Sequence, residues 1–119
     1  MAYHGVELQN SITIEKIFSI HYFEYMSNFS FAGESHNFWE FICVDKGEVG
    51  VTRGKSYTIL KKGDLIFHKP NEFHDVKATG GIAPNLVVIS FECNDDAMYF
   101  FNDRLLPVSY THLTLPTIA

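Results

Sequence analysis

Between residues 12 and 93 the chain alternates between short apolar runs and clusters of turn-forming residues. The runs are rich in β-branched and aromatic residues, and Gly, Asp, Asn and Pro separate them at intervals of roughly eight to twelve residues, as in sandwiches and small barrels. The stretch Ser27–Glu34 breaks this alternation, and we expect it to be a loop. The predicted strands are Ile12–Met26 (one or two strands), Phe38–Val44, Glu48–Arg53, Tyr57–Leu60, Leu65–Lys69, His74–Ala78 and Asn85–Cys93.

The pattern changes after the last of these strands. Asn94 is a suitable N-cap, and Asp95 and Asp96 follow in what would be the first turn of a helix, where acidic groups suit the helix dipole. Met98 and Phe101 would then share one face of a short C-terminal helix. Because two of the predicted strands are apolar on both faces, their outer faces need cover from a second sheet, this helix or another subunit.

The composition and net charge of the chain indicate a single globular domain that does not bind nucleic acid by itself. The 119 residues are 46% hydrophobic, which suits one domain with its own core. The formal net charge is −5, and the scattered Lys and Arg residues form no basic patch of the kind that grips nucleic acid. Neither a signal peptide nor a membrane span is evident, so we expect a cytoplasmic location. Cys43 and Cys93 lie within apolar runs and are predicted to be free thiols.

Polar side chains at the start of the strand near residue 40 are the main candidates for chemistry. His36 and Glu40 have the same parity, so they would share one face of an extended strand, whereas Trp39 would face the other way. A carboxylate among apolar neighbours is costly unless it has a partner, and His36 or His74 could supply one. Imidazole and carboxylate ligands together suit Zn, Mn, Fe, Ni or Cu.

At these positions the sequence resembles the two signature motifs of cupins. The first motif position that normally holds a histidine carries Glu34 instead. The resemblance implies an all-β fold, a cupin-like β-barrel or double-stranded β-helix jelly roll. It also implies a vestigial divalent-metal set of His36, Glu40 and His74. The matching residues are His36, Glu40 and Gly47 in the first motif, and Gly63, Pro70 and His74 in the second.

A longer set of phrases is similar to the N-terminal domain of AraC-type transcription regulators. The phrases are HYFEY, ESHNFWEFICVDKGEV, YTILKKGD, IFHKPNEFHDV and APNLVVISFEC, which span about residues 12–101. The resemblance implies a non-catalytic sensor without a required cofactor that binds a small polar effector, a sugar being the expected class. It also implies a homodimer whose contact with DNA runs through a C-terminal helix-turn-helix domain absent from this chain. The pocket candidates are His36, Glu40, His74, Glu34, Phe38 and His21.

Residues 1–106 are therefore predicted to form the effector-binding and dimerisation domain. Residues 107–119 are predicted to be a non-native tail, because Val-Ser-Tyr-Thr-His at 108–112 matches one translated frame of a common sequencing adaptor. Two alternatives stay open: a small metal-dependent cupin enzyme, such as an isomerase or dioxygenase, and a stand-alone scaffold.

Three further interpretations concern residues outside the main motifs. We expect the aromatic residues Tyr22, Phe23, Tyr25 and Phe29 to belong to the core. His68 is expected to face solvent or to be hydrogen-bonded, and Asp64 to accept backbone hydrogen bonds in a turn.

Overall fold

The computed structural model describes residues 3–5, 12–102 and 104–107. The predicted tail at 108–119 lies outside these residues, so its origin stays a prediction. Within the described ranges, no helix is long and apolar enough to cross a membrane. The elements of the described chain are β1 (Lys16–Glu24), β2 (Ser30–Glu34), β3 (Trp39–Lys46), β4 (Glu48–Arg53), β5 (Ser56–Lys61), β6 (Asp64–His68), β7 (His74–Thr79), β8 (Asn85–Glu92), the 3₁₀ helix η1 (Asp96–Phe101) and β9 (Leu105–Pro107).

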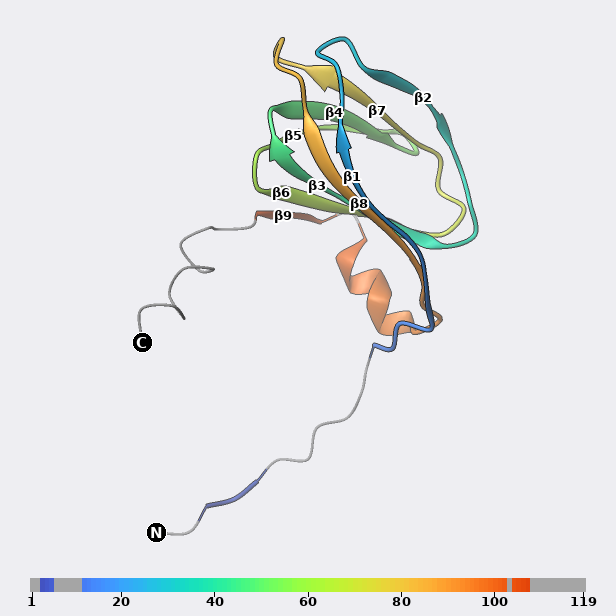
Figure 1. Cartoon of the computed structure of the whole chain (residues 1–119). Helices are drawn as coiled ribbons and strands as arrows, with labels where there is room; N and C mark the ends of the chain where they lie inside the picture. Colours follow the sequence, from blue (N-terminus) through green and yellow to red (C-terminus); the bar gives the residue numbers. More distant parts are fainter. Residues whose placement is uncertain (1–2, 6–11, 103, 108–119) are drawn as a thin grey trace.

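Two antiparallel sheets face each other across the core (Figure 1). One has the strand order β1-β8-β3-β6-β9, and the other has the order β2-β7-β4-β5. Most connections therefore cross from one sheet to the other, as expected of a jelly roll. The all-β prediction is confirmed.

The stretch 27–34 is not wholly a loop, as the sequence had indicated, because its second half forms β2. This strand pairs with β7, and its register shifts between Phe31 and Glu34. Gly33, which lies within the shift, has a φ of 105°, and a Cβ there would meet the ring of Phe73. A bulge with a positive-φ glycine hides the period-two pattern on which strand prediction depends.

The C-terminal helix is present but differs from the prediction in two respects. It is a single short 3₁₀ segment, and Asp95 rather than Asn94 is its N-cap residue. The carboxylate of Asp95 makes no cap hydrogen bond to the helix; it accepts one from the backbone N–H of Thr13, at 2.5 Å. The acidic residue thus ties the start of the helix to the segment that leads into β1.

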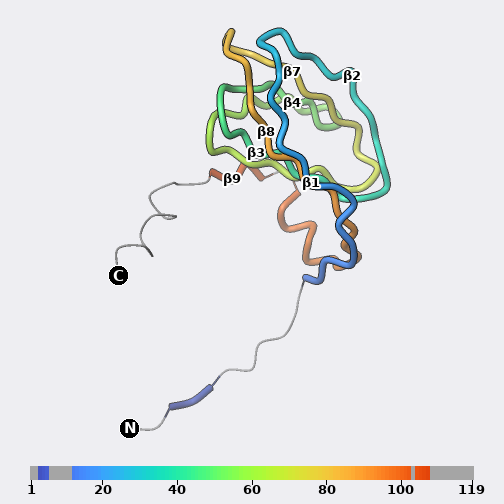
Figure 2. The backbone as a smooth tube through the Cα atoms, viewed as in Figure 1, coloured from blue at the N-terminus to red at the C-terminus, as the bar shows by residue number. Residues whose placement is uncertain are grey.

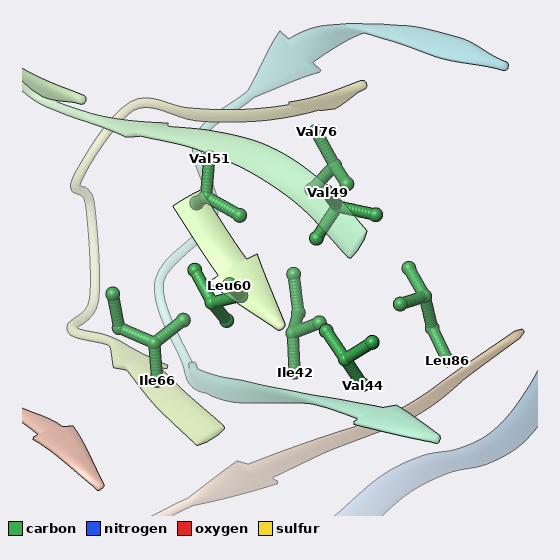
Figure 3. Packing of buried hydrophobic residues seen from close by; sticks show 8 residues of the cluster. All are labelled: Ile42, Val44, Val49, Val51, Leu60, Ile66, Val76 and Leu86. Carbon is green, nitrogen blue, oxygen red and sulfur yellow. The ribbon is translucent and has the colours of Figure 1, made fainter. Parts of the chain in front are cut away.

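Aliphatic side chains that project from both sheets fill part of the space between them (Figure 3). Alternate residues of each strand point inward, which is why short runs such as Ile42 and Val44 contribute to one cluster. The members of this inner core are Ile42, Val44, Val49, Val51, Leu60, Ile66, Val76 and Leu86.

A second cluster lies on the outer face of the five-stranded sheet, where η1 covers it (Figure 1). Trp39 is fully buried there and packs edge-on against Tyr99, with ring centroids 5.1 Å apart. Phe91, Cys93 and Met98 complete the buried part of the cluster. The predicted outward orientation of Trp39 and the two free thiols are confirmed, and of the three covers that the sequence left open, the helix is the one that lies on this face.

Candidate functional site

A cavity of about 370 Å³ opens between the sheets. Its size falls in the range of small-molecule sites. β1 forms one wall beside β8, and Figure 2 shows the two strands running next to each other. Because inward-facing residues alternate, Ser19, His21 and Phe23 of β1 line the cavity together with Val88 and Ser90 of β8.

Four polar side chains converge at one side of this cavity. Glu40 comes from β3, Glu34 from the end of β2, His74 from the start of β7, and His36 from the connection between β2 and β3. One nitrogen or carboxylate oxygen of each residue lies within 4.8 Å of the corresponding atom of the others. Pairing of Glu34 with His74 across β2 and β7 brings two of the four together. The structure thus assembles all the polar pocket candidates except His21, which lies on β1.

The tautomers of the two histidines follow from their backbone contacts. Nδ1 of His36 lies 3.0 Å from the carbonyl oxygen of Phe38, and Nδ1 of His74 lies 3.0 Å from that of Glu72. A carbonyl oxygen only accepts hydrogen bonds, so both Nδ1 atoms carry protons. In each ring, Nε2 is therefore the atom turned toward the carboxylates.

The Nε2 atoms of His36 and His74 differ in their hydrogen-bond partners. Nε2 of His36 lies 2.8 Å from a carboxylate oxygen of Glu40, so one proton is shared between these groups. Nε2 of His74 lies 3.9 Å from the same oxygen and has no hydrogen-bond partner among the described residues. Since His74 is 1% exposed, the cavity presents a buried acceptor that is left unsatisfied.

His68 lies behind this group, contrary to the expectation that it faces solvent or is hydrogen-bonded. It is fully buried, its ring stacks on His74 at 4.1 Å, and neither ring nitrogen has a hydrogen-bond partner in the described residues. Burial, followed by electrostatic interactions with the His74 ring and with Arg53, lowers the pKa of His68 to about 2, so the ring is neutral. Its pairing opposite Glu40 turns it inward, and the parity it shares with buried Ile66 is the signal in the sequence that indicates this.

Aromatic rings form another wall of the cavity; of those that the sequence predicts to be core, Tyr25 and Phe29 also pack against the inner core. The rings of His21, Phe23, Tyr25 and Phe29 stack in series, with centroid separations of 5.0, 5.2 and 3.7 Å, and all four line the cavity. Tyr22 does not belong to this wall, because it faces outward and donates a hydrogen bond to Asp45.

The remaining ring at the polar side is that of Phe38. It lines the cavity as predicted and stacks on His36, with centroids 4.0 Å apart. Across the cavity, burial and the Glu40 carboxylate raise the pKa of Tyr25, so its phenol stays protonated near the acidic group.

The donor set fits a divalent transition metal. Two imidazole nitrogens and two carboxylate oxygens are ligands that such ions accept. The Nδ1 contacts with backbone carbonyls are the kind of outer contact that orients histidine ligands. If a metal were bound, His36, His74, Glu40 and Glu34 would hold it, and it would supply Lewis-acid chemistry at this end of the cavity.

Comparisons with known proteins give the same fold. A predicted oxalate decarboxylase from Thermotoga maritima superposes with a TM-score of 0.62 at 18% identity, over 65% of this chain and 68% of that one. The Cnp3 cupin domain of Schizosaccharomyces pombe gives 0.61 at 16% identity, over 72% and 58%. A cupin superfamily protein from Desulfitobacterium hafniense gives 0.59 at 14% identity, over 76% and 84%. These likenesses confirm the cupin fold. No curated protein matches the sequence.

A family model described as the AraC-like ligand binding domain matches residues 18–99. That range contains both sheets from β1 to β8, the four converging polar residues and the whole aromatic wall. The chain belongs to the family of AraC-like ligand binding domains.

Proposed function

We propose that this domain is the effector sensor of a transcription regulator and that a small polar molecule occupies the cavity between its sheets. The observation that carries the proposal is the unsatisfied Nε2 of His74, which is buried at the wall of a ligand-sized cavity. A buried acceptor of this kind costs free energy until a donor reaches it, and a hydroxyl or N–H group of an effector would supply one. A sugar is the expected class from the sequence, and the aromatic rings that line the cavity, such as Phe31 and Phe38, could pack against it.

Signalling would follow from linkage. The effector must bind one arrangement of the regulator more tightly than another, and its differential affinity limits how far the equilibrium moves. In this proposal the readout is a helix-turn-helix domain that binds DNA in the cytoplasm. A homodimer is also proposed. The outer face of β1 supports it, because Ile17, Ile20 and Tyr22 are each more than half exposed there.

The proposed role is non-catalytic and requires no cofactor. A metal-dependent cupin enzyme is the second candidate, and the convergence of Glu34, His36, Glu40 and His74 is the observation that favours it. Metal analysis of protein purified without chelator separates the two. Stoichiometric Fe, Mn or Ni that is lost in His36→Ala and His74→Ala would favour the enzyme.

Thermal unfolding in the presence of a metabolite panel tests the sensor proposal. An effector at about 100 times its Kd stabilises the domain by about 2.7 kcal/mol, which raises Tm by on the order of 10 °C for a domain of this size. His74→Ala should abolish the shift, whereas the matched control His4→Ala, at an exposed position, should retain it. The absence of a shift with every member of a broad panel would contradict the proposal.

A further inference from the structure

The charges around the cavity are of one sign. Glu34 and Glu40 lie at its polar end, and among the described residues that line it there is neither Lys nor Arg. One proton shared between His36 and Glu40 offsets a single negative charge, so the group keeps one net negative charge, although Oε1 of Glu34 also lies 3.8 Å from Nε2 of His36. An anionic ligand would meet repulsion here, whereas a cationic one would be attracted.

Three hydrogen-bond acceptors remain at this site after His36 has paired with Glu40. A carboxylate has about four lone-pair sites, so Glu40 can accept from His36 and still accept from a ligand. The Glu34 carboxylate and the bare Nε2 of His74 are the other two, all within 4.8 Å of one another. A primary ammonium has three N–H donors in tetrahedral directions. At about 2.8 Å from each acceptor, they would place the acceptors about 4.6 Å apart.

The rest of the cavity suits the body attached to such a group. Phe31 and Phe38 line the cavity together with Tyr25 and Phe29, whose rings stack on each other. Aromatic faces attract cations and pack against apolar or aromatic carbon skeletons. A bare metal ion would occupy only the polar end, and as a ligand of His36 it would have to displace the 2.8 Å contact with Glu40.

From these observations we propose that the effector is a primary amine with an apolar or aromatic body, its ammonium held by Glu34, Glu40 and Nε2 of His74. The proposal rests on the proposed sensor function and narrows it to one class of ligand. Glu40 and His74 form the buried part of the ammonium site, and Glu34, whose side chain is 52% exposed, closes it at the mouth of the cavity.

The test is calorimetric titration of the wild-type domain with a panel of primary amines of graded size, namely ethanolamine, cyclohexylamine, benzylamine and 2-phenylethylamine. Each is matched to the alcohol and the carboxylate of the same skeleton. We expect saturable binding of at least one amine, with its alcohol weaker by about tenfold or more, since hydrogen bonds to charged groups carry that difference. The carboxylate should not bind.

Two variants test whether the amine binds at this site, and a third is their control. Glu40→Gln and Glu34→Gln should each weaken the amine by about tenfold or more, while Glu24→Gln, the same change on an exposed part of β1, should leave its affinity unchanged. Glu34 is largely exposed, so its variant keeps the test valid if Glu40→Gln fails to fold.

The outcomes separate this proposal from the one on which it rests. Sugars or other neutral polyols that bind while every amine fails would overturn the amine assignment and leave the sensor function intact. Stoichiometric binding of Zn²⁺ or Mn²⁺ at these residues, with no amine binding, would overturn it in favour of a metal site. Failure of every amine, polyol and metal would count against both proposals.

Discussion

The buried polar atoms of His68 lower the free energy of unfolding of the domain. Replacing His68 with an apolar residue should therefore raise it. The neutral ring holds one N–H and one lone pair, neither with a hydrogen-bond partner in the described residues. Each unmade bond costs about 1–3 kcal/mol. His68→Leu removes both polar atoms at similar volume and forfeits the stacking on His74. We expect the variant to be more stable than wild type by about 1–3 kcal/mol at pH 7.5.

Acid should enlarge this difference. The ordinary pKa of a histidine is 6.5, and that of folded His68 is about 2. Between these values the unfolded chain binds a proton that the folded chain does not, so stability is fully present above pH 6.5 and falls as the pH drops below it. From pH 7.5 to 5.0 this single group removes about 2 kcal/mol from the wild type and nothing from His68→Leu.

Urea unfolding of both proteins at the two pH values is the assay. Other titrating groups are shared, so they cancel in the difference between the proteins, which should grow by about 2 kcal/mol toward pH 5.0. His4→Leu, at an exposed position, should follow the wild type at both pH values. Parallel loss of stability in wild type and His68→Leu would refute the reasoning, because His68 would then be protonated alike in both states.

Three smaller predictions concern the scaffold. Trp39→Leu should lower the free energy of unfolding in urea by about 2–4 kcal/mol and expose Met98 to solvent, because it leaves a cavity in the outer cluster beneath η1. Unchanged stability would show that the helix does not pack on this ring. Gly47→Ala should cost about 1–2 kcal/mol, since φ is 75° there and a Cβ would lie 3.2 Å from the backbone of Pro84; a stabilised variant would contradict the assigned turn. Asp64→Ala should cost about 1 kcal/mol by removing the 2.8 Å bond from the backbone N–H of Lys61, and Asp64→Asn should recover part of it.

The alternation of residues along β3 was enough to predict which of its side chains face inward. Parity alone placed Glu40 inside and Trp39 outside, and the structure has both so. The turn before His74 is equally local, because Pro70 ends β6 and the chain resumes in β7. The grouping of His36, Glu40 and His74 came from the resemblance to the cupin motifs, and the structure brings them together; their role in binding an effector stays a prediction.

What the sequence did not predict depends on contacts between distant segments. β2 is a strand because β7 lies beside it, and the register shift near Gly33 removes the alternation that would have indicated it. The role of the ring series from His21 to Phe29 depends on the position of β1 at a sheet edge, since the same aromatic residues on a central strand would be core. Composition cannot distinguish these two placements, whereas the order of strands does.

In the proposed function, the buried Nε2 of His74 accepts a hydrogen bond from an effector that binds in the cavity. A long-range ¹H–¹⁵N spectrum of the histidine rings, recorded without and with a ligand found by thermal shift, measures this directly. We expect His74 to be protonated at Nδ1 in the free protein and its Nε2 resonance to move on saturation, while that of exposed His4 does not. Saturable binding with an unchanged His74 resonance would contradict the proposal.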